Sequence, residues 1–157
     1  MKVLHISNKP VFPLIDGGCH AMNGLLECFI HLNYSVDHIC ISTQKHPFNP
    51  SAYPSNLKVT TVEIDTTLKA VVALKCLLKG ESYNLSRFKT KEFEKMLVNS
   101  IRSNQYDLIL FDSIYSAVFI KEIKQITTAK LVIRTHNVEY KIWSELSQKA
   151  RNPLKKW

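Results

Sequence analysis

Short apolar segments alternate with longer segments whose hydrophobic residues recur at helical spacing. Apolar runs bounded by turn-forming residues predict buried strands, and apolar positions three and four residues apart predict amphipathic helices. Strands are predicted at Val3–Ile6, Val36–Ser42, Leu57–Ile64, Asp107–Phe111 and Lys130–Arg134. Helices are predicted at Cys19–Leu32, Leu68–Lys79, Glu92–Arg102, Ile114–Ile123 and Val138–Lys149. This alternation predicts an α/β fold with an open, mostly parallel sheet and helices on both faces.

Turn-forming residues separate several of these elements. Pro47, Pro50 and Pro54 make the segment 45–56 a loop. Asn33 and Gly80 each follow a helical segment, where residues that tolerate a left-handed backbone commonly end helices. Gly24 lies inside the first helix, where glycine costs about 1 kcal/mol relative to alanine. We therefore expect Gly24 to allow tight packing of this helix against a strand.

Three polar segments follow predicted strands directly. They are 8–18, Asp112-Ser113 and 135–140. Parallel α/β sheets bind ligands outside the carboxyl ends of their strands. The ligand site is therefore predicted where these segments meet.

Gly17 and Gly18 stand between the first strand and the first helix. A helix N-terminus has free backbone N–H groups, and glycine lets a phosphate approach them closely. The preceding loop is long and contains Pro10 and Pro13, unlike the tight glycine turn of dinucleotide-binding domains. The pair therefore suggests a site for a sugar nucleotide or a similar phosphate. The alternative is a plain loop-to-helix turn that needs a positive φ at one position.

His136 follows the last predicted strand and has Asn137 and Glu139 beside it. A histidine there can bind a substrate hydroxyl or act as an acid or base near neutral pH. It can equally cap the next helix or bind a loop carbonyl, and the sequence favours neither role. His5 and His38 lie in predicted strands and are weaker candidates.

Composition narrows the class of protein without naming a function. The 157 residues are 45% hydrophobic and 22% charged, with a net charge of +8, which is compatible with anionic substrates or an anionic membrane surface. The basic residues are scattered and accompany no nucleic-acid motif. The four cysteines have no metal-binding spacing and indicate a reducing, cytoplasmic compartment. Cys28 and Cys40 are expected to be buried.

Cys19 offers a weaker catalytic alternative. It is predicted at a helix start, which could lower the pKa of its thiol, and His20 is adjacent. Neighbouring residues on a helix do not face each other, so a nucleophilic pair is a minor hypothesis.

Three segments together resemble the N-terminal domain of a retaining GT-B glycosyltransferase of family 4, also called group 1. The first is Met1-Lys-Val-Leu-His-Ile with Pro13 and Gly17-Gly18, similar to that family's opening strand and glycine loop. The second is Tyr106-Asp-Leu-Ile-Leu-Phe-Asp-Ser113, similar to a strand leading into the acceptor cleft. The third is Arg134-Thr-His-Asn-Val-Glu-Tyr140, close to an H-N-x-E-Y form. The resemblance covers residues 1 to about 150.

The resemblance implies a Rossmann-like domain that binds most of the acceptor and faces a second domain that binds most of the nucleotide sugar. It places Gly17 and Gly18 on the donor diphosphate or transferred sugar, and His136 in the reacting region. Asp16, Asp112, Ser113, Asn137 and Glu139 are the residues expected on the acceptor side. Transfer would proceed with retention, with neither a cofactor nor a metal. The reaction would belong to the synthesis of a bacterial polysaccharide or glycolipid.

The resemblance also implies that this chain is one half of a longer enzyme. The paired glutamates that hold the nucleotide sugar in this family belong to the second domain, so the chain alone is expected to be inactive. The alternative is a non-catalytic phosphate- or nucleotide-binding α/β module. A third and weaker hypothesis is a sugar-nucleotide hydrolase or epimerase.

Lys69, Lys75 and Lys79 lie in or beside the second predicted helix and could place the protein on the cytoplasmic face of an anionic membrane. The preferred interpretation is a core helix with solvated lysines.

Overall fold

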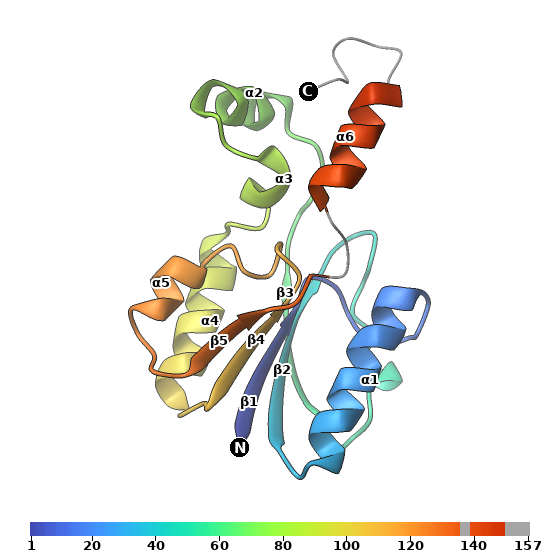
Figure 1. The fold of residues 1–157 in the computed structure, drawn as a ribbon, viewed down its shortest axis with the longest axis vertical. Coiled ribbons are helices and arrows are strands. Elements are labelled where there is room, and N and C mark those ends of the chain that lie inside the picture. Colours follow the sequence, from blue (N-terminus) through green and yellow to red (C-terminus); the bar gives the residue numbers. More distant parts are fainter. Residues whose placement is uncertain (136–138, 150–157) are drawn as a thin grey trace.

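The computed structural model describes residues 1–135 and 139–149. Its centre is an open sheet of five parallel strands in the order β3-β2-β1-β4-β5 (Figure 1). The strands are β1 (Lys2–Ser7), β2 (Ser35–Ser42), β3 (Lys58–Glu63), β4 (Leu108–Asp112) and β5 (Lys130–Ile133). The predicted α/β class is confirmed, and the fold is consistent with a Rossmann-like domain.

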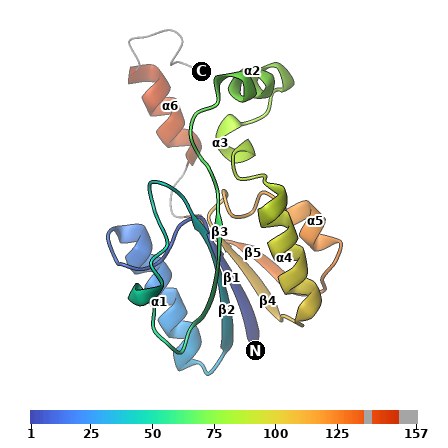
Figure 2. The ribbon, with the colours of Figure 1, turned by 180° about the vertical axis from the view of Figure 1, so that it is seen from behind.

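Helices cover both faces of this sheet. The described helices are α1 (Gly17–His31), α2 (Ala70–Lys79), α3 (Tyr83–Ser86), α4 (Lys91–Ser103), α5 (Ile120–Lys124) and α6 (Glu139–Lys149), with a short 3-10 turn η1 (Pro50–Ala52). Helix α1 lies against one face, and α4 and α5 lie against the other (Figures 1 and 2).

Alternation along β1 explains this layering. Leu4 and Ile6 join the larger core with Phe93 and Leu97 of α4. Val3 points to the other face and packs with Phe29 of α1. Because both faces of β1 are covered, nearly the whole strand is buried.

The ends of α1 follow their local sequence. Asp16 is the N-cap, and its side chain accepts a hydrogen bond from Cys19 N at 2.9 Å. After the C-cap Leu32, Asn33 has a left-handed backbone with φ of 56°. Gly80 ends α2 in the same way with φ of 66°. The predicted stops at Asn33 and Gly80 are confirmed.

The predicted helix 114–123 is wrong over its first half. Residues 114–119 form successive turns, with Ala117 N donating to Ile114 O at 3.3 Å and Ile120 N donating to Ala117 O at 3.0 Å. Ala117, Phe119 and Ile123 are nevertheless buried in the larger core. The apolar spacing therefore reflects burial of the segment and not a continuous helix.

Two smaller predictions about packing are also wrong. A Cβ atom added at Gly24 would meet nothing within 4 Å, so this glycine does not serve close packing against a strand. Cys28 is exposed, whereas Cys40 is buried as expected.

Helix α2 departs most from its predicted role. Within it only Cys76 is buried, while Val71 is 69% exposed and Leu78 is 80% exposed. The helix lies beyond the carboxyl ends of the strands, away from the sheet (Figures 1 and 2). The preferred interpretation of a core helix is therefore incorrect. No helix in the described part of the chain is long and apolar enough to cross a membrane.

Candidate functional site

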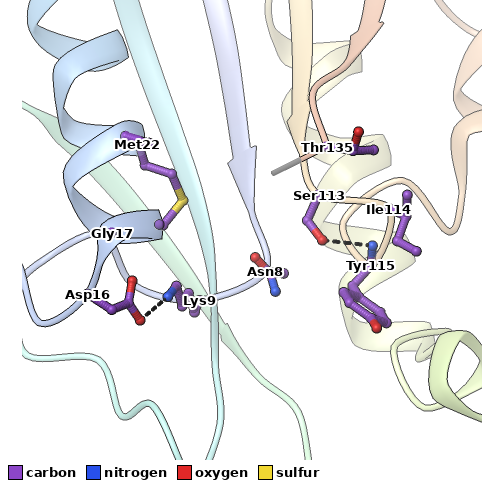
Figure 3. Close-up of a pocket in the computed structure, with 11 residues that line it drawn as sticks. Asn8, Lys9, Asp16, Gly17, Met22, Ser113, Ile114, Tyr115 and Thr135 are labelled. Carbon is purple, nitrogen blue, oxygen red and sulfur yellow. Dashed lines mark hydrogen bonds and ion pairs between the residues drawn. The ribbon is translucent and has the colours of Figure 1, made fainter. Parts of the chain in front are cut away.

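A cavity of about 560 Å³ opens at the carboxyl ends of β1 and β4. Its walls come from the loop after β1, the first turns of α1 and the segment that follows β4 (Figure 3). The chain leaves β1 toward β2 on one side and reaches β4 on the other, so the strand order reverses here. Such a switch point is where open parallel sheets bind their ligands. The lining residues are Asn8, Lys9, Asp16, Gly17, Gly18, Ala21, Met22, Ser113, Ile114, Tyr115 and Thr135.

The α1 side of the cavity offers hydrogen-bond donors. The Asp16 side chain accepts a hydrogen bond from Cys19 N. Among the described residues, no protein acceptor binds the N–H groups of Gly17 and Gly18. A Cβ at Gly17 would meet nothing within 4 Å, whereas a Cβ at Gly18 would lie 3.2 Å from Asp16 Oδ1 and 3.3 Å from Lys9 Nζ. Gly18 is therefore the position where the absence of a side chain matters.

Lys9 and Asp16 form an ion pair beside these glycines (Figure 3). The hydrogen bond from Lys9, with a second from Cys19 N, holds the pKa of Asp16 below its usual range. The carboxylate is therefore negative at neutral pH, and it neutralises part of the charge that Lys9 brings to the cavity. The Asp16 carboxylate therefore weakens the attraction that the Lys9 ammonium would exert on a bound anion.

The loop between β1 and α1 is tied down before it reaches the glycines. Val11 is fully buried, and its N–H donates to the Tyr53 hydroxyl at 2.8 Å. Ser7 Oγ donates to Lys9 O at 2.6 Å, and Cys19 Sγ donates to Pro10 O at 3.7 Å. These contacts fix the glycine turn relative to the end of β1. The Cys19 thiol donates to Pro10 O and is fully buried, so it is not placed as a nucleophile.

Ser113 forms the opposite side of the cavity in an unusual backbone conformation. Its φ is 149°, a region that residues with a side chain rarely adopt. Its hydroxyl accepts a hydrogen bond from Tyr115 N at 3.1 Å, which stabilises the turn after β4 (Figure 3). Strained residues concentrate at ligand sites, and this one lies where the strand ends and the cavity begins.

A buried polar network lies directly behind the cavity. Asp112 is fully buried, and one of its oxygens accepts from His5 Nε2 at 2.9 Å. Its other oxygen accepts from Arg134 Nε at 2.8 Å. Burial alone would raise the pKa of Asp112, but the hydrogen bonds from His5 and Arg134 lower it below its usual range. The buried carboxylate is therefore charged and compensated.

His38 extends this network to β2. Its Nδ1 lies 2.9 Å from His5 Nδ1, and the two rings are stacked with centroids 4.8 Å apart. One of these two nitrogens must therefore carry a proton and donate a hydrogen bond to the other. Within the described residues, the buried His38 Nε2 has no hydrogen-bond partner. Burial, and next the adjacent His5, lowers the pKa of His38 well below its usual value.

Several predicted site residues meet in the structure. Gly17, Gly18, Asp16 and Ser113 all line the cavity. Asp112 does not line it, and its complete burial does not fit direct contact with an acceptor. His136 and Asn137 lie outside the described residues, and Glu139 begins α6 without a described side chain. Their assignments stay predictions.

The sequence interpretation missed Lys9, Arg134 and the role of His5. Lys9 and Arg134 both follow strands closely, so the rule about carboxyl strand ends could have found them. Arg134 also donates to Ala21 O of α1 at 3.2 Å, which no sequence spacing indicates. His5 and His38 occupy paired positions of adjacent parallel strands, a register that only the folded sheet defines.

The described residues include no group of three or more His, Cys, Asp or Glu side chains placed to hold a metal ion. No family model, curated protein or solved structure matches this chain, so the cavity has to be interpreted from its own geometry and from the sequence motifs.

Proposed function

We propose that this chain is the acceptor-side domain of a retaining glycosyltransferase. It would take part in moving a sugar from a nucleotide-sugar donor to a saccharide or a lipid-linked acceptor. The observation that carries the proposal is the cavity at the switch point, because it brings Gly17-Gly18 and Ser113, two of the resembling segments, to opposite walls of one site. A third segment begins at Arg134 and supplies Thr135 to the same cavity.

The chemistry of the walls suits a phosphorylated sugar. The N–H groups of Gly17 and Gly18 and the ammonium of Lys9 are donors suited to phosphate oxygens. Asp16 and Ser113 can bind sugar hydroxyls, and the side chains of Met22, Ile114 and Tyr115 provide apolar surface for a pyranose ring. A leaving diphosphate held at the glycines would be stabilised as its charge develops.

The proposal is tested by sugar transfer in the protein expressed from its full native reading frame. A panel of nucleotide sugars is supplied with polysaccharide and membrane-extract acceptors, and nucleoside diphosphate release is measured. Gly18→Val should obstruct the donor phosphate, and His136→Ala should lower turnover by about 10²-fold. Gly24→Ala and His20→Ala are matched controls on α1 and should retain full activity.

The outcomes separate the open alternatives. Full activity in both Gly18→Val and His136→Ala would overturn the site assignment. Binding of a nucleoside diphosphate without turnover, abolished by Gly18→Val, would favour the non-catalytic module. Release of product without any acceptor would favour a hydrolase or epimerase. Sugar transfer by the 157-residue chain alone would contradict the expectation that it needs a second domain.

A further inference from the structure

Helix α2 presents its apolar side to solvent. Leu78 is 80% exposed and Val71 is 69% exposed. In a helix that packs on a core, such apolar side chains would be buried. The other exposed apolar side chains of this segment are Leu68, Val72, Leu74 and Leu77. A concentration of large apolar side chains on one short exposed helix marks an interaction surface.

Four of the exposed apolar residues share one side of α2, and Val72 lies outside this group. At about 100° per residue, Leu77, Leu74, Leu78 and Val71 fall within roughly a third of the helix circumference. Cys76 points the other way, toward α3, where its Sγ lies 3.3 Å from Ser86 Oγ. Cys76 therefore faces the domain, and the described part of the chain does not cover the apolar face of α2.

Positive charge borders this apolar face. Lys75 and Lys79 are both exposed and lie along one edge of it. Residues 66–89 contain one acidic residue, Glu81, and five basic residues, which are Lys69, Lys75, Lys79, Arg87 and Lys89. Lys69 is partly compensated from outside this segment, because its Nζ lies 3.0 Å from Asp65 Oδ2. Within the part of the chain that the structure describes, Lys75 and Lys79 form no ion pair, and both side chains are exposed to solvent.

We propose that α2 docks the protein on an anionic lipid surface, with its leucines and Val71 inserted at the level of the headgroups. A helix with an apolar face bordered by lysines is suited to lie in the plane of such an interface. The lysine stems can follow the apolar face while their ammonium groups reach lipid phosphates. A second copy of the chain fits less well, because pairing two α2 helices would bring the same positive charges together.

The position of α2 supports this arrangement. The helix lies at the end of the molecule toward which the parallel strands run, beyond their carboxyl ends (Figures 1 and 2). The cavity opens at that same end. Docking through α2 would therefore hold the cavity side of the domain toward the lipid surface. The docking inference stands on the exposed residues of α2 and does not depend on the proposed reaction.

The test is flotation of the 157-residue chain with two kinds of vesicle, pure phosphatidylcholine and an equal mixture of phosphatidylcholine and phosphatidylglycerol. We expect binding to the mixed vesicles that weakens as NaCl is raised. Leu74→Ser/Leu78→Ser should abolish binding, and Lys75→Glu/Lys79→Glu should weaken it at least about tenfold.

Two matched controls make the result specific. Ile30→Ser/Leu32→Ser removes two exposed apolar side chains from the far end of α1, and Lys91→Glu/Lys95→Glu makes the same charge change on α4. Both controls should bind as the parent does. Equal loss in the α4 variant would show attraction by overall charge and overturn the proposal.

Sedimentation equilibrium separates the remaining occupants of the face. The chain should be monomeric without lipid, and circular dichroism should show that every variant folds. Self-association that Leu74→Ser/Leu78→Ser abolishes, without binding to mixed vesicles, would assign α2 to a second copy. Absence of both binding and self-association would also overturn the proposal.

Discussion

Arg134 Nε donates a hydrogen bond to Asp112 Oδ1 at 2.8 Å and thereby joins the ends of β5 and β4. The same guanidinium reaches Ala21 O on α1 at 3.2 Å. Ser113 and Thr135, which line the cavity, follow Asp112 and Arg134 directly in the chain. The pair therefore positions one wall of the site, although Asp112 itself is buried behind it.

Replacing Asp112 by Asn should destabilise the protein substantially. The change leaves the Arg134 guanidinium without its anionic partner and removes a charged acceptor from His5. We expect a loss of about 2 to 4 kcal/mol in the free energy of unfolding, measured by urea titration. The control Asp65→Asn removes a solvent-exposed ion pair with Lys69 and should leave the urea midpoint unchanged. Equal midpoints for the two variants would contradict a supporting role for Asp112.

Stability should fall as pH drops below about 6.5 because of His38. The pKa of His38 is lowered in the folded protein by burial and by the adjacent His5, so protons bind the unfolded chain more readily. The contribution is fully present above the unfolded pKa and is lost from there down toward the folded pKa. Its slope approaches about 1.4 kcal/mol per pH unit.

Urea titrations between pH 8 and pH 5 measure this dependence for the parent and for His38→Gln. The variant should have a shallower dependence, whereas His20→Gln, on an exposed histidine, should keep the slope of the parent. The pKa of His46 is also lowered, by burial and by Lys9, so a smaller slope of the same sign should remain in His38→Gln. An unchanged slope in His38→Gln would show that His38 is not the group responsible.

Gly24→Ala should stabilise the protein by up to about 1 kcal/mol. Gly24 lies inside α1 with nothing within 4 Å of an added Cβ, so alanine gains helix propensity without a clash. Gly18→Ala is the matched test, because its Cβ would press on Asp16 Oδ1 and Lys9 Nζ. Thermal unfolding should rank Gly24→Ala above the parent and Gly18→Ala at or below it. The reverse order would mean that Gly24 has a packing role after all.

Asp16→Asn should strengthen the binding of inorganic pyrophosphate. Asparagine keeps the N-cap acceptor for Cys19 N but removes the negative charge beside Lys9. Because the pair is partly exposed, we expect a gain of about threefold to tenfold in affinity by calorimetry. Lys9→Met should weaken binding, while Asp65→Asn should have no effect. This prediction rests on the proposed phosphate site, and weaker binding by Asp16→Asn would contradict it.

Much of the fold was predictable because its signals are local. The apolar run at 107–111 and the helical spacing after Gly18 appear directly in the chain, and both elements form close to the predicted bounds. The segment 114–123 was mispredicted because buried turns can reproduce helical apolar spacing. For helix α2 the secondary structure was predicted correctly, but its burial was not. Its apolar pattern correctly indicated a helix but could not show which side would face the domain.

The sequence by itself determined the alternation of strands and helices, the glycine pair at a helix start, and the polar residues at strand ends. These depend on backbone preference and on the period of side chains within one element. Only the tertiary structure decided that His5 and His38 are neighbours, that Arg134 connects Asp112 to α1, and that the apolar face of α2 is exposed. Those relationships depend on the register between strands and on the packing of elements distant in sequence, which no local pattern encodes.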